Sequence, residues 1–121
     1  MRDLGDAANQ GDEGGVRAEI VLEDGYLSAA ANLHHGDRLH VLTWLDRADR
    51  EVLAVHPRDD PTRPLTGVFS TRSPDRPNPI GLHDVTVLAT EGTVLTVEPL
   101  EVLDGTPVID LKPILPPIEG R

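Results

Sequence analysis

Three closely spaced prolines constrain the fold of this chain more than any other feature. Pro74, Pro77 and Pro79 fall within the segment GVFSTRSPDRPNPIG, residues 67–81. Each proline ring fixes its own φ angle and disfavours the helical conformation of the residue before it. The segment is therefore expected to be a stiff, extended loop. An alternative interpretation is that it only rigidifies a connection between two strands.

The same segment carries two arginines, Arg72 and Arg76. A guanidinium group is a planar fork that pairs with a carboxylate or a phosphate and also stacks on a base. Two such groups on a stiff backbone are pre-organised before any ligand arrives. We therefore expect an anionic or planar ligand at this loop.

The overall charge alone does not favour nucleic-acid binding, because the formal net charge is −10 at pH 7. Phosphate contacts from basic residues supply most of the affinity for nucleic acids. Residues 61–83, however, contain Arg63, Arg72 and Arg76 against one carboxylate, Asp75. The basic charge is thus focused on the proline loop, and the acidic remainder is expected to be a solvated surface.

The composition indicates one small, mainly β domain without disulfides or a metal site. The 121 residues include no cysteine, and His34, His35, His40, His56 and His83 lack the spacing of metal ligands. Neither a leader pattern nor an apolar run of membrane-spanning length is visible. We expect a cytoplasmic protein without a membrane segment.

Alternating apolar and polar residues predict strands joined by short turns. Residues 16–22 and 38–45 show this alternation, with Leu39, Val41, Thr43 and Leu45 on one face. The other expected strands are 66–71, 84–89, 93–97 and 106–111. The expected turns are 24–25, 91–92 and 104–105. A two-turn helix capped by Asp24 is expected at 26–33. Turns this short exclude parallel crossovers. The predicted fold is mainly β, a single-sheet antiparallel β-barrel with one short helix.

Two long segments carry a resemblance to a known family. The proline loop at 67–81 and DGTPVIDLKP at 104–113 resemble the signature pair of the TsaA-like or TrmO family, and the resemblance extends over about residues 10–112. Members of that family are S-adenosylmethionine-dependent methyltransferases acting on N6 of threonylcarbamoyl-adenosine beside the tRNA anticodon. The resemblance implies a barrel that forms a homodimer, S-adenosyl-L-methionine as cofactor, and the tRNA anticodon loop as partner.

The resemblance also implies roles for individual residues. Those expected to bind the cofactor are Gln10, Asp46, Arg47, Arg72, Leu82, Asp104, Gly105, Thr106 and Pro107. Arg72, Arg76 and Asn78 are expected to contact the substrate.

A general base is plausible because the acceptor nitrogen is amide-like, and Asp104 and then Asp110 are the candidates. These two are six residues apart, so on a continuous strand they would share one face. An inward carboxylate would need a cationic partner, for which Lys112 or a bound sulfonium would serve.

The N-terminus departs from the family pattern. Relatives open with a strand followed by Pro-Arg-Gln or Pro-Lys-Gln, whereas this chain has Ala8-Asn9-Gln10 without the basic residue. We therefore expect a disordered or partly ordered segment at 1–15, a barrel at 16–113 that lacks one strand, and a loosely ordered tail at 114–121.

Two other functions are compatible with the sequence. The missing basic residue and the acidic charge favour an enzyme that methylates a small molecule with the same cofactor. The second alternative is a non-catalytic module that only binds a ligand.

Overall fold

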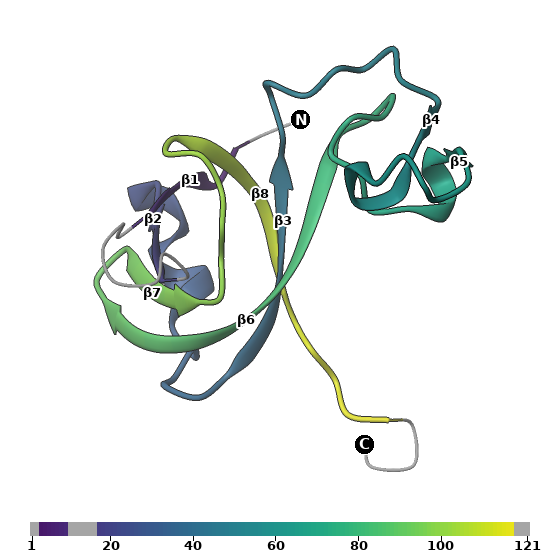
Figure 1. Cartoon of the computed structure of the whole chain (residues 1–121). Helices are drawn as coiled ribbons and strands as arrows, with labels where there is room; N and C mark the ends of the chain where they lie inside the picture. The colour runs from purple at the N-terminus through teal and green to yellow at the C-terminus, as the bar shows by residue number, and fades with distance from the viewer. Residues whose placement is uncertain (1–2, 10–16, 118–121) are drawn as a thin grey trace.

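A closed barrel of six antiparallel strands forms the body of the molecule (Figure 1). The computed structural model describes residues 3–9 and 17–117. The barrel strands are β1 (Gly5–Asn9), β2 (Ala18–Leu22), β3 (Arg38–Trp44), β6 (Ile80–Glu91), β7 (Val94–Glu98) and β8 (Thr106–Pro113). They lie in the order β1-β2-β7-β6-β3-β8, and β8 pairs with β1 to close the sheet. The predicted fold class is confirmed.

The barrel interior is filled by the inward-facing side chains of strands in which buried and exposed residues alternate. Ala18, Ile20 and Leu22 are buried on β2, as are Leu39, Val41 and Thr43 on β3. Leu45, expected on the same face, lies just beyond the end of β3. The remaining buried aliphatic residues of the core are Ala7, Val85, Val87, Leu95, Val97, Leu100 and Val108.

The expectation that the barrel lacks its first strand is wrong. β1 pairs with β2 from Gly5↔Leu22 to Asn9↔Ala18, and with β8 from Gly5↔Val108 to Ala7↔Thr106. A Cβ atom at Gly5 would collide with the carbonyl of Val21, so a glycine is needed for this close approach. The barrel therefore includes residues before position 16, where the sequence analysis begins the domain.

The helix after β2 differs from its prediction in type and in position. It is a 3₁₀ helix, η1 (Asp24–Ala30), rather than an α-helix at 26–33, and Glu23 occupies the N-cap without a side-chain hydrogen bond. Asp24 is thus not the cap, and residues 24–25 begin η1 instead of forming a hairpin turn. The turns at 91–92 and 104–105 are present, with positive φ angles at Gly92 (59°) and Gly105 (84°).

A small lobe projects beside the barrel, beyond one end of β3 and β6 (Figure 1). This side lobe consists of β4 (Ala54–Val55), η2 (Pro57–Asp59), β5 (Thr66–Gly67) and η3 (Val68–Ser70). β4 and β5 pair with each other as a separate two-stranded sheet. The strand expected at 66–71 therefore ends at Gly67, because the chain turns into η3.

Candidate functional site

Two hollows lie at opposite ends of the antiparallel pair β3 and β8. One, here called the loop hollow, is next to the proline loop and has a volume of about 530 Å³. Its lining residues are Leu45, Asp46, Arg47, Ala48, Pro74, Asp75, Glu101, Val102, Leu103 and Thr106. The other, here called the helix hollow, lies between η1 and the far ends of the same strands and measures about 490 Å³.

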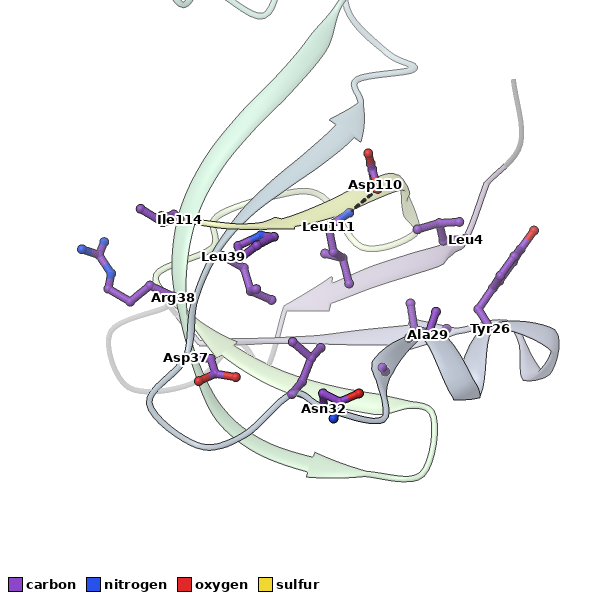
Figure 2. A pocket seen from close by; sticks show the side chains of 14 residues that line it. Leu4, Tyr26, Ala29, Asn32, Asp37, Arg38, Leu39, Asp110, Leu111 and Ile114 are labelled. Carbon is purple, nitrogen blue, oxygen red and sulfur yellow. Dashed lines mark hydrogen bonds between the residues drawn. The ribbon is translucent and has the colours of Figure 1, made fainter. Parts of the chain in front are cut away.

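The helix hollow is mainly apolar on its inner side. Figure 2 shows Leu39 and Leu111 facing the space beside η1, and Asp110 on the other side of β8 from Leu111. Among the expected site residues in the described chain, only Asp110 borders this hollow. The loop hollow is therefore the better candidate for the functional site.

The proline loop is tied to the segment that follows β3. Arg50 donates from Nε to the Pro77 carbonyl at 2.8 Å and from Nη2 to Oδ1 of Asn78 at 3.2 Å. Its guanidinium carbon also lies 5.3 Å from the ring centroid of Trp44, a cation–π distance. These contacts fix the proline loop relative to the segment after β3, and both segments line the loop hollow. Sequence reasoning missed Arg50, which is hidden in the charged run DRADRE.

Arg76 stabilises the loop from inside. Its Nη1 donates to the carbonyl oxygens of Thr71 at 2.9 Å and Ser73 at 3.3 Å. A guanidinium held by main-chain carbonyls has a structural role in this conformation, and its expected contact with substrate stays a prediction. Asn78 likewise accepts a hydrogen bond from Arg50 within the protein.

The turn before β8 places Thr106 in the loop hollow. The Thr106 amide donates to the Leu103 carbonyl at 3.1 Å, and its hydroxyl donates to the same oxygen at 2.6 Å. Gly105 supplies the positive φ that such a turn requires. Asp104 lies exposed in this turn, while Gly105 and Pro107 border a smaller hollow of about 260 Å³ beside β1.

The continuous strand that would place Asp104 and Asp110 on one face is not present, for two reasons. Asp104 belongs to the turn, since β8 begins at Thr106. The register against β3 then shifts, from Leu42↔Asp110 to Thr43↔Val108, and such a bulge reverses which residues face inward. Asp110 is consequently half-exposed on the outer face, where Lys112 Nζ lies 3.0 Å from its carboxylate.

A polar pair is packed at the end of β3 that leads to the loop hollow. Thr43 Oγ1 and His83 Nε2 are 3.0 Å apart. Burial lowers the pKa of His83 below its ordinary value of 6.5, and the nearby Asp84 carboxylate opposes this shift. The lowered pKa favours the neutral form of the His83 imidazole. Gly81 leaves room for the pair, since a Cβ there would collide with the Thr43 hydroxyl and lie 2.8 Å from His83 Nε2.

The expected cofactor residues are only partly brought together. Asp46, Arg47 and Thr106 line the loop hollow. Arg72 lies instead in a groove of the side lobe, and Leu82 is on the outer face of β6 with 43% of its surface exposed. Gln10 lies outside the described residues. Glu101, Val102 and Leu103 complete the hollow without any signal in the sequence, because a turn brings them there.

The sequence profile of the tRNA-methyltransferase O N-terminal domain matches residues 6–119. The chain belongs to this family.

The relatives of this chain include proteins named as S-adenosyl-L-methionine-binding proteins. A probable S-adenosyl-L-methionine-binding protein of Methanothermobacter thermautotrophicus is 45% identical over 115 residues, covering 95% of this chain and 82% of the relative. One from Archaeoglobus fulgidus is 49% identical over 100 residues, which is 81% of this chain but 26% of that protein.

Solved structures agree with the fold. A crystal structure of TrmO has a TM-score of 0.73 at 25% identity and covers 98% of this chain and 58% of that one. TrmO from Pseudomonas aeruginosa has a TM-score of 0.72 at 24% identity, with 96% and 55% covered. The chain thus spans little more than half of these structures.

Residues 3–9 and 17–117 contain no group of three or more histidine, aspartate or glutamate side chains arranged to hold a metal ion. None of the helices in those ranges is long and apolar enough to span a membrane.

Proposed function

We propose that this chain is an S-adenosylmethionine-dependent methyltransferase whose cofactor site is the loop hollow. The observation that carries the proposal is that Asp46, Arg47 and Thr106, which the family resemblance implies as cofactor-binding residues, come together in one hollow. Its volume of about 530 Å³ is in the usual range for cofactor pockets. The names of the curated relatives support the same cofactor.

The donor set of the loop hollow fits this cofactor. Arg47 offers a guanidinium for the carboxylate of the methionine part, and Asp46 and Glu101 offer carboxylates for its ammonium group and for the ribose hydroxyls. Leu45 and Val102 supply apolar surface for the adenine ring. When bound, S-adenosylmethionine supplies an electrophilic methyl group. The work of the protein is to orient the acceptor and exclude water.

Asp104 is the better of the two candidate bases. Its turn connects directly to Thr106 in the loop hollow, whereas Asp110 borders the helix hollow at the other end of β8. We therefore assign proton acceptance from the acceptor nitrogen to Asp104 and no catalytic role to Asp110.

The proposed acceptor is N6 of threonylcarbamoyl-adenosine beside the tRNA anticodon. Support comes from the family and from the stiff proline loop with its arginines, which suits an unstacked base in a single-stranded RNA loop. This substrate implies a cytoplasmic location.

The test is nucleoside mass spectrometry of tRNA incubated with the protein and isotopically labelled S-adenosylmethionine. We expect the label on threonylcarbamoyl-adenosine, and its loss in Arg47→Ala. Arg38→Ala, at the opposite end of β3, is the matched control and is expected to label tRNA like the wild type. Label found only in small metabolites, or cofactor binding without any transfer, would refute the tRNA assignment in favour of one of the two alternatives.

We further propose a homodimer that packs through the outer face of β3 and β6. The cross-strand pairs Leu42↔Leu82 and Trp44↔Ile80 place four apolar side chains on this face. Ile80 is 44% exposed and Leu82 43%. A second copy packed here would also be consistent with the cofactor role that the family resemblance implies for Leu82, which lies outside the loop hollow of its own chain.

A further inference from the structure

Another hollow, lined largely by polar and charged residues, lies in the side lobe next to the loop hollow. This lobe groove has a volume of about 490 Å³ and runs between η2 and the segment 70–74. The pairing of β4 with β5 brings these two segments together, because η2 follows β4 and η3 follows β5. Pro74 lines both the lobe groove and the loop hollow, so the two are neighbours across the proline loop.

Two exposed arginines, Arg58 and Arg72, line the lobe groove. Neither guanidinium makes a hydrogen bond or ion pair with the described part of the chain. The nearby arginines differ: Arg63 pairs with Asp60 at 3.7 Å, and Arg76 is held by carbonyls of its own loop. Asp59 is the one carboxylate among the residues that line the groove.

The backbone of η2 is unusual at the groove. Arg58 and Asp59 both have positive φ angles, 57° and 55°, which non-glycine residues rarely adopt. The turn is fastened at its base by a 2.8 Å contact between His56 Nδ1 and the Arg63 carbonyl. This backbone conformation costs free energy that an unstrained loop would not. Non-glycine residues with strained backbone conformations cluster at ligand sites.

We propose that the lobe groove binds the phosphodiester backbone of RNA, with Arg58 and Arg72 each contacting a phosphate. The inference rests on the proposed function, in which the acceptor is part of an RNA. An open groove with two guanidinium groups that have no partner among residues 3–9 and 17–117 suits successive phosphates better than a single carboxylate, which one guanidinium would satisfy. RNA held here passes beside Pro74 and so beside the loop hollow. Arg72 accordingly contacts substrate, one of its two expected roles.

The experiment is a fluorescence anisotropy titration of a labelled RNA anticodon stem-loop across a series of salt concentrations. Arg58→Ala is expected to weaken binding about tenfold at low salt, since a charge-assisted hydrogen bond is lost. It should also reduce the slope of log K against log salt by roughly 0.7 to 0.9, the value for one phosphate contact. Arg58→Gly should give the same losses of affinity and slope. Because glycine adopts a positive φ without strain, this variant separates the loss of the guanidinium from an effect of misfolding. Arg38→Ala is the matched control, because Arg38 is exposed and has no side-chain partner in the described residues.

Two results would refute RNA binding in the lobe groove. One is that the Arg58 variants match Arg38→Ala in RNA affinity and in its salt dependence; the other is that the wild-type protein does not bind the RNA. Calorimetry with S-adenosylmethionine on the wild type reports on the proposed function separately. Binding of RNA through Arg58 without cofactor binding would refute the proposed function and support the groove. Cofactor binding together with an RNA affinity that does not depend on Arg58 would support the proposed function and refute RNA binding in the groove.

Discussion

Gly81 shows most clearly how single residues shape the region around the loop hollow. A Cβ there would collide with Thr43, lie 2.8 Å from His83 Nε2, and lie 3.4 Å from a methyl group of Leu45. Gly81→Ala is therefore expected to destabilise the protein by about 1–3 kcal/mol, as overpacking does. Urea denaturation measures this. Gly25→Ala is the control, since a Cβ at Gly25 would meet nothing within 4 Å; equal losses in the two variants would contradict the account.

His83 gives a prediction for pH. Its pKa in the folded protein is below the ordinary 6.5, so the unfolded chain takes up a proton first as the pH falls. Stability should therefore be unaffected by this group above pH 6.5 and decrease below it, down to the folded pKa. We expect His83→Gln, which cannot titrate, to flatten the fall in urea midpoint between pH 7 and pH 5. A fall as steep as that of the wild type would show that other groups are responsible.

At the scale of elements, Arg50 joins the segment after β3 to the proline loop. Arg50→Ala removes the hydrogen bonds to Pro77 and Asn78, and we expect S-adenosylmethionine affinity to fall about tenfold, or roughly 1.4 kcal/mol. Arg50→Lys keeps the charge but not the fork, so it should be impaired as well.

Trp44 provides an independent readout of this contact. It is the single tryptophan of the chain and lies under Arg50, so its fluorescence emission should shift in both variants. Unchanged emission together with unchanged cofactor affinity would mean that Arg50 does not hold the loop.

The elements that were predictable from sequence are those in which one local pattern dominates. Alternation identified the buried faces of β2 and β3, and Gly92 and Gly105 marked real turns. The position of Asp110 was not predictable, because the bulge in β8 that turns it outward depends on pairing with β3. The side-lobe groove was missed for a different reason, since β4 and β5 are only two residues each and alternation cannot reveal strands this short.

At the scale of the whole molecule, the proposed dimer predicts the effect of a surface substitution. Leu82→Ser should shift the protein toward monomer in sedimentation velocity while the monomer stays folded, as judged by circular dichroism, because Leu82 is outward-facing and 43% exposed. Leu27→Ser, 48% exposed on η1, should leave the dimer intact. A monomeric wild type, or a dimer indifferent to Leu82, would rule out this interface.

The central claim is that the hollow beside the proline loop holds the methyl donor. The most direct measurement is a crystal structure of the protein grown with S-adenosylmethionine. The account predicts cofactor density in contact with Leu45, Arg47 and Thr106. Density at the other end of the barrel, against Leu39 and Leu111, would contradict it.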